Sequence, residues 1–366
     1  MKFLRLAFYV LIAQLVLSGC AGEAVEETSS SSSSEINFDA YVGRNASTRS
    51  EVIDNTFLQG GNFNAGFGVF ARYKHTKEEN SSLMLMDNEH VTWQENHWGY
   101  TNTRYWPNEG FVDFYAFAPH STAPNLNNNF EIDFPSNMSP VDLVYAKAEG
   151  KTKADNPVKF TFKHALARLG FDITANQELL EDGTVITVKE VRLYGATETS
   201  GIFLMGGHLN LQTGGWRPYD NHIRWFYTWT PDGKVEGEED GEEGKEEGNK
   251  DGNKDGEEVK KIIYKLSASQ LDYKTPSITN ADDSYIFIIP QKKPEYFNLK
   301  LTYTVKQGEF EEDVTVKKDL LKVFPSGDDS KPFIEGGKAY VFHLKLLDPI
   351  NFDVSADVNP WGKDDQ

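Results

Sequence analysis

Apolar and polar residues alternate with a period of two in short runs along most of the chain. The clearest run covers residues 158–163, where valine and phenylalanine take every second position, and similar runs occupy residues 169–174, 298–305 and 340–346. Successive side chains of a β-strand point to opposite faces, so the pattern indicates strands with one face on a core and the other in water. After the signal-like N-terminus, no long apolar pattern has the helical period. The sequence therefore predicts an all-β fold of antiparallel β-sandwiches rather than a parallel sheet flanked by helices.

The N-terminal residues have the composition of a lipoprotein signal peptide. Lys2 and Arg5 provide positive charge, residues 6–17 form an apolar stretch, and two small residues precede Cys20. The stretch is short for a transmembrane helix, and the residues after it are acidic rather than basic. We therefore expect residues 1–19 to be removed as a signal peptide. Acyl chains such as palmitate on Cys20 would then anchor the mature protein to a membrane.

Cys20 is the only cysteine of the chain, which excludes an intramolecular disulfide and a thiolate metal cluster. A run of six serines follows shortly after it. Such a polar run has no apolar surface to bury, so we interpret residues 20–35 as a lipidated serine-rich tether. Order is expected to begin near Glu35, because residues 36–42 form a β-type run.

The mature chain of about 345 residues suits two domains better than one. We place the first β-sandwich domain at residues 36–166 and the second at residues 167–366, because one strand-like run passes directly into the next at this point. Residues 232–260 consist almost entirely of Glu, Asp, Gly, Lys and Asn, which predicts a disordered acidic insertion in the second domain. The net charge of −19 argues against nucleic acid and anionic membrane surfaces as partners.

No motif predicts catalysis or a cofactor. The eight histidines lack the spacing of a zinc hydrolase, and no serine lies in a Gly-x-Ser-x-Gly turn. Residues 251–256 begin like a calcium-binding loop, but Ile262 takes the twelfth position, where a bidentate carboxylate is required. We therefore predict no catalytic residue, no metal site and no enzymatic activity, while calcium binding by the acidic insertion stays open.

Tryptophan clusters suggest a binding surface as an alternative to core packing. Exposed aromatic side chains stack on the flat apolar faces of sugars or on partner proteins. Residues 225–229 place aromatic residues on both faces of any strand, so Trp225, Tyr227 and Trp229 are the candidate exposed platform. For Trp93 and Trp106 we favour burial in the core.

Several segments, in this order along the chain, resemble the fimbrillin-like family, the subunits of type V pili of Gram-negative anaerobes. Together they cover nearly the whole mature chain. They are residues 36–38, 48–50, 67–71, 105–107, 112–119, 142–148, 158–169, 285–291 and 337–342, followed by Trp361.

This resemblance implies two transthyretin-like β-sandwich domains in tandem, export as a lipoprotein and delivery to the outer-membrane surface. In that family a surface protease cuts after an arginine beyond the first strand, and a strand of the next subunit fills the exposed groove. Arg49 is the first candidate for this cut and Arg44 the second. Other pilus subunits would be the partners, and the function would be that of a fimbrial subunit with a role in adhesion.

The position of such a subunit in a fibre stays open between stalk, tip and anchor. The acidic insertion at residues 232–260 is unusual for a compact stalk subunit and favours an accessory or tip role. The alternative function is a cell-surface lipoprotein that binds glycans through its aromatic side chains.

Overall fold

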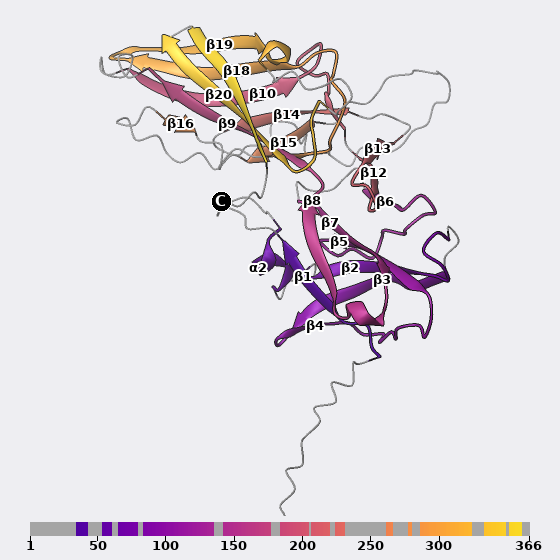
Figure 1. Cartoon of the computed structure of the whole chain (residues 1–366). Coiled ribbons are helices and arrows are strands. Elements are labelled where there is room, and N and C mark those ends of the chain that lie inside the picture. The colour runs from indigo at the N-terminus through magenta and orange to yellow at the C-terminus, as the bar shows by residue number, and fades with distance from the viewer. Residues whose placement is uncertain are drawn as a thin grey trace, which may run out of the picture. The chain divides into compact units, whose positions relative to one another are not determined.

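The computed structural model has a compact unit, Glu35–Gln366, which contains all the strands of the described residues (Figure 1). Cys20, Arg44, Arg49 and the acidic insertion at residues 232–260 lie outside the described residues, so the hypotheses about them are not tested. Only the backbone is described for residues 224–230, 261–265 and 277–279. The described residues are 34–42, 53–60, 65–79, 83–134, 142–176, 184–204, 206–219, 224–230, 261–265, 277–279, 286–323, 333–348 and 351–360.

In the first half of the compact unit, residues 35–166, the described residues form eight strands and two short helices. They are β1 (Phe38–Val42), α2 (Asn55–Leu58), β2 (Phe67–Lys74), β3 (Leu83–Gln94), β4 (His97–Gly99), β5 (Phe111–Ala118), β6 (Glu131–Phe134), β7 (Val144–Lys151), η1 (Lys153–Asp155) and β8 (Val158–His164).

The second half, residues 167–366, continues in the same style, and the all-β prediction is confirmed. Its elements are β9 (Ala167–Ala175), β10 (Val185–Tyr194), β11 (Phe203–Leu204), β12 (Gly207–Asn210), β13 (Trp216–Pro218), β14 (Arg224–Thr230), β15 (Lys261–Lys265), β16 (Ser277–Thr279), β17 (Ile286–Ile288), β18 (Asn298–Gln307), β19 (Phe310–Asp319), η2 (Leu320–Lys322), β20 (Lys338–Asp348) and β21 (Asn351–Pro360). Within the described residues, no helix is long and apolar enough to cross a membrane.

Seven strands of the first half form one sheet in the order β1-β8-β7-β5-β2-β3-β4 (Figure 1). Its central strands, β2 and β5, are buried on both faces, which explains why their sequences do not alternate. One face contributes to a cluster that we call the first core, and the other contributes to a cluster that we call the shared core. The first core includes Ile36, Phe38, Val42, Phe67, Trp98, Phe114 and Phe160, and the shared core includes Phe70, Tyr115, Phe117, Phe134, Leu209, Phe287 and Ile289.

The second half forms a sandwich of two sheets around one apolar cluster. One sheet has the order β11-β14-β10-β18-β19 and the other the order β16-β9-β20-β21. Alternate residues of both sheets meet in this second core, including Phe171 of β9, Leu193 of β10, Leu301 of β18 and Phe342 of β20. The sandwich expected from the alternating runs is therefore confirmed.

Most pairs of described strands are antiparallel, as predicted, but three of these pairs are parallel. They are β1 with β8, β9 with β20, and β14 with β15. Alternation determines which face of a strand is buried, and this face is the same for either direction of the neighbouring strand. The sequence pattern therefore could not reveal these three pairs.

A three-stranded sheet connects the two halves of the unit. β6 of the first half pairs with β12 of the second, and β12 pairs with β13. The shared core also combines residues of both halves, and it includes Ala165 and Leu166 between β8 and β9. The assignment of residues 36–166 and 167–366 to separate domains stays a prediction.

Glu131 supports this three-stranded sheet electrostatically. Its carboxylate accepts hydrogen bonds from Nε and Nη2 of Arg217 at 3.1 and 2.9 Å, and a third from Asn127 at 3.0 Å. The bonds from Arg217 are the main reason why the pKa of Glu131 falls from 4.5 to about 2. Ionised Glu131 therefore stabilises the fold above pH 4.5, and this contribution is lost as the pH falls toward 2.

We expect Glu131→Gln to lower the free energy of unfolding at neutral pH and to reduce the loss of stability on acidification below pH 4.5. Urea unfolding at a series of pH values measures both effects. Glu295→Gln, at an exposed glutamate, is the control. Identical pH profiles for the two variants would contradict the role of the Arg217 contact.

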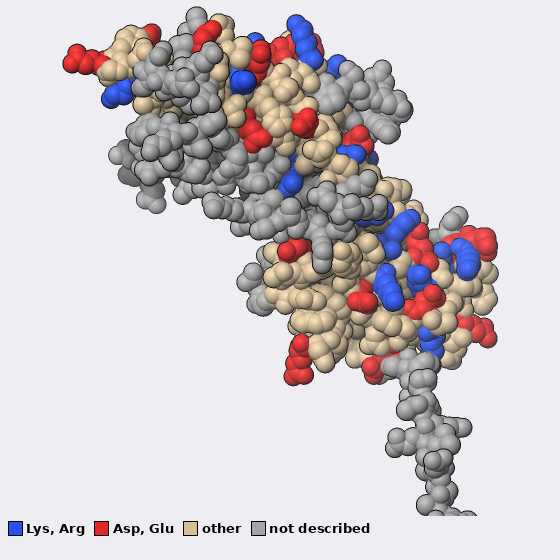
Figure 2. All heavy atoms as spheres, turned by 60° about the vertical axis from the view of Figure 1, so that its left-hand side comes forward, with Lys and Arg blue, Asp and Glu red and all other residues tan. Residues whose placement is uncertain are grey.

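Charged side chains do not separate by sign among the described residues of the face shown in Figure 2. On the face shown in Figure 2, lysine and arginine side chains lie among aspartate and glutamate side chains. This face therefore has no broad basic area of the kind that binds polyanions.

Candidate functional site

β1 is an edge strand whose apolar side chains fill a groove of the first core. Phe38 and Val42 are buried, as is Ile36 just before the strand, while Tyr41 is exposed. The strand pairs in parallel with β8, in a register that places Phe38 opposite Val158. In the described part of the chain, β8 is the only strand that pairs with β1.

Phe38 is the largest apolar side chain that β1 contributes to this groove. Its ring lies 5.7 Å from that of Phe160, which it stacks against, and 6.2 and 5.9 Å from those of Phe67 and Phe114, which it meets edge to face. The ring of Tyr100 also lies 5.7 Å from that of Phe38, in a tilted arrangement. Removal of β1 would therefore expose aromatic surface from β2, β5 and β8 in a single groove.

Hydrogen bonds hold both ends of β1. At its start, the backbone N–H of Ile36 donates to the carbonyl of Arg104 at 2.8 Å, and the Tyr100 hydroxyl donates to the carbonyl of Ile36 at 2.8 Å. At its end, the amide of Asn55 bonds both the N–H and the carbonyl of Val42, at 2.8 and 3.2 Å. All of these contacts are noncovalent and join β1 to segments that follow it in the chain.

The chain after β1 has an anchor of its own. The backbone N–H of Ile53 donates to a carboxylate oxygen of Asp142 at 3.0 Å, and the same oxygen lies 2.8 Å from Nδ1 of His164. Asp142 is fully buried and the His164 side chain is 5% exposed. Ile53 is therefore joined to the body by a contact that does not involve β1.

The aromatic residues proposed as a platform are placed only by their backbone. Trp225, Tyr227 and Trp229 belong to β14, which pairs with β10, β11 and β15. Their side chains lie outside the described set, so the platform stays a prediction. Of the tryptophans assigned to the core, Trp106 is buried against Phe114, and Trp93 is half-buried.

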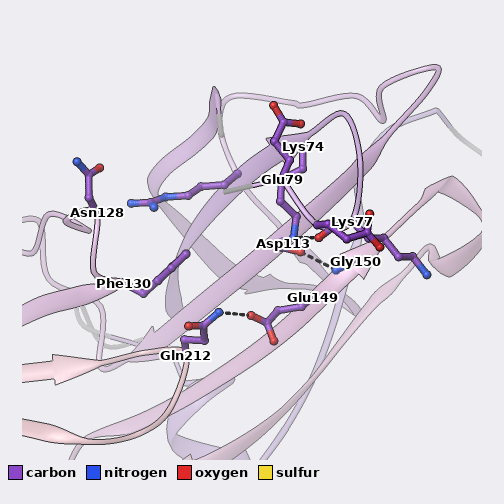
Figure 3. A pocket seen from close by; sticks show the side chains of 11 residues that line it. Lys74, Lys77, Glu79, Asp113, Asn128, Phe130, Glu149, Gly150 and Gln212 are labelled. Carbon is purple, nitrogen blue, oxygen red and sulfur yellow. Dashed lines mark hydrogen bonds and ion pairs between the residues drawn. The ribbon is translucent and has the colours of Figure 1, made fainter. Parts of the chain in front are cut away.

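The sequence did not predict a polar pocket of about 710 Å³, which lies beside β2, β5 and β7 (Figure 3). No motif marks it, because its lining comes from short stretches far apart in the chain. In the described part of the chain, no group of three or more His, Cys, Asp and Glu side chains could hold a metal ion, in this pocket or elsewhere. The lining consists of Arg72, Lys74, Lys77, Glu78, Glu79, Asp113, Asn128, Phe130, Glu149, Gly150 and Gln212.

The fold is that of the fimbrial β-sandwich proteins. A crystal structure of a fimbrial protein from Bacteroides vulgatus ATCC 8482 superposes with a TM-score of 0.57 at 20% sequence identity, covering 89% of this chain and 99% of that one. The family model described as fimbrillin-like matches residues 48–361, so the chain belongs to the fimbrillin-like family. The resemblance found in the sequence is confirmed.

A curated relative, the fimbrium subunit Fim1C of Phocaeicola vulgatus, is 27% identical over 189 residues. The match covers 44% of this chain and 48% of the relative, so it spans about half the length of that protein.

Proposed function

We propose that this protein is a type V pilus subunit with a role in adhesion, assembled with other pilus subunits by strand exchange at the groove that β1 fills. Its export as a lipoprotein through Cys20 and its delivery to the outer-membrane surface belong to the same proposal. Membership of the fimbrillin-like family supports the general role. The observation that carries the mechanism is the position of β1, an edge strand with Phe38 and Val42 inserted into the first core.

Strand exchange requires that the resident strand can leave while the rest of the protein stays folded. Arg44 and Arg49 lie between Val42, the last residue of β1, and Ile53, which Asp142 anchors. A cut after either arginine would leave β1 attached only through noncovalent contacts. Its departure would uncover backbone N–H and C=O groups of β8 together with an apolar groove, and an incoming strand could satisfy both.

Trimming the purified protein with an arginine-specific protease tests this proposal. We expect the trimmed chain to form a ladder of heat-stable oligomers in gel electrophoresis, because an exchanged strand is buried along its whole length. N-terminal sequencing of the product shows whether Arg49 or Arg44 was cut.

Arg44→Lys combined with Arg49→Lys is the matched control, because it preserves both charges and removes the cleavage sites. This variant should stay monomeric under the same treatment. Trimmed protein that has lost residues 36–42 and remains monomeric at high concentration would show that the groove does not accept a neighbouring strand.

A further inference from the structure

The pocket beside β2, β5 and β7 has the size of a small-molecule site. Its volume of about 710 Å³ lies within the roughly 300–1,000 Å³ typical of ligand pockets. Figure 3 shows Asn128 and Phe130 on one side, Lys74 and Asp113 on the other, and Gln212 and Glu149 below them. Gln212 follows β12 in the second half, so both halves of the unit contribute to the wall.

Arg72 and Asp113 are charged residues of this wall that are more than nine-tenths buried, at 7% and 4% exposure. Asp113 is compensated, because Nζ of Lys74 lies 2.6 Å from its carboxylate and the N–H of Gly150 donates to it at 2.6 Å. Arg72 differs. Its Nη2 donates to the carbonyls of Leu126 and Asn127 at 3.3 and 2.6 Å, and no described carboxylate forms an ion pair with it.

A buried cation is ordinarily paired with an anion, because burial removes its hydration. Burial accordingly lowers the pKa of Arg72. Its Nε and Nη1 make no hydrogen bond to any residue that the structure describes. Arg72 therefore offers the pocket a positive charge and unused N–H donors.

Two other carboxylates of the wall, Glu149 and Glu79, already have donors. Glu149 accepts hydrogen bonds from Lys147 at 2.8 Å, from the Tyr115 hydroxyl at 2.9 Å and from Gln212 at 2.7 Å. Glu79 accepts from the backbone N–H groups of the β2–β3 turn. At the rim, Glu78 is exposed, and the ammonium of Lys77 lies 5.1 Å from the centre of the Phe111 ring. The hydrogen-bonding groups left for a ligand near Arg72 are therefore the N–H donors of its positively charged guanidinium.

Phe130 supplies the apolar part of the wall in a costly backbone conformation. Its φ of +62° is rare for a bulky residue and costs on the order of 1–3 kcal/mol. The guanidinium carbon of Arg72 lies 4.8 Å from the centre of its ring, and the Tyr115 ring lies 5.0 Å away. Such strain is concentrated at binding sites, where it holds a side chain in place.

We propose that this pocket binds a sugar residue carrying a carboxylate, with that carboxylate on Arg72 and the apolar C–H groups of the sugar against Phe130. Hydroxyl groups are complementary to the amides of Asn128 and Gln212, which can donate and accept. The planar guanidinium is suited to bind a carboxylate through two parallel hydrogen bonds. The site lies outside the β1 groove, so this inference does not depend on strand exchange.

Calorimetric titration of the full chain with methyl β-D-glucuronide and methyl β-D-glucoside tests the proposal. We expect the acidic sugar to bind at least about tenfold more tightly, a difference of ~1.4 kcal/mol. Arg72→Gln should abolish that preference, whereas Arg104→Gln, at an exposed arginine outside the pocket, should leave it unchanged.

Phe130→Gly provides a second variant that does not disturb the charge of the pocket. Glycine adopts a positive φ without strain, so this variant keeps the loop while removing the ring, and it should weaken the acidic sugar about tenfold or more. Equal affinity for the two sugars, or undiminished binding in both variants, would overturn the proposal. Tighter binding of a short acidic peptide than of the glucuronide would overturn the assignment to sugars.

Discussion

Replacing Phe38 with alanine is expected to lower the free energy of unfolding by about 3–5 kcal/mol. The side chain is 5% exposed and meets four aromatic rings, so its removal leaves a cavity that the surrounding sheet cannot close. Chemical denaturation of the uncut protein measures the change. Tyr41→Ala on the same strand is the matched control, since that side chain is 44% exposed, and it should change stability by less than about 0.5 kcal/mol.

The same two variants also test whether the stability contributed by β1 controls its release after cleavage. If the strand of a neighbour takes the place of β1, the buried apolar side chains of β1 determine how stably this strand stays bound in its own groove. Phe38→Ala should then release its first strand more readily after cleavage, whereas Tyr41→Ala should not. Similar stability losses in the two variants would show that β1 rests on the surface of the body and does not fill a groove.

Replacing Asp142 with alanine is expected to cost about 3–5 kcal/mol, because the buried carboxylate accepts from two groups at once. Its loss would leave the backbone N–H of Ile53 and the ring of His164 without this acceptor in a dry environment. Thermal and urea unfolding measure the effect. Limited proteolysis should also show faster cleavage near residue 53 in the variant, since the anchor of the segment after β1 is removed.

Asp133→Ala is the control for that experiment. Asp133 also pairs with a histidine, His208, but its side chain is 71% exposed. An exposed pair of this kind contributes about 0–1 kcal/mol, so the control should be close to wild type. If both aspartate variants lost the same stability, burial could not be the reason for the cost at Asp142.

The period-two alternation predicted β9, β18 and β20 of the second core, because alternate residues of these strands face that core. β8 is a comparable case in the first half, where Val158, Phe160 and Phe162 are buried and the alternating residues Lys159, Thr161 and Lys163 are exposed. The alternation did not predict the pairing of strands. β6 pairs with β12, more than seventy residues later, through backbone groups that carry no side-chain signature.

The sequence pointed to one of the two candidate sites, the groove that β1 fills, and not to the other, the pocket beside β2, β5 and β7. The resemblance to the fimbrillin-like family pointed to the first strand, since the segment at residues 36–38 lies at the start of β1. The pocket gave no such signal. Arg72, Asp113 and Gln212 meet only after three separate stretches have folded, and nothing in the sequence indicates that Phe130 has a positive φ. Spacing along a chain reveals a site only when its residues share one element.

The pairing of β6 with β12 determines how this protein would respond to mechanical load. The direct covalent link between the two halves is short, because only Ala165 and Leu166 separate β8 from β9. Traction that pulls the halves apart would also have to rupture the β6–β12 ladder and expose the shared core. In an appendage made of such units, the middle of each subunit would therefore resist stretching through the β6–β12 hydrogen bonds as well as through the short peptide link between β8 and β9.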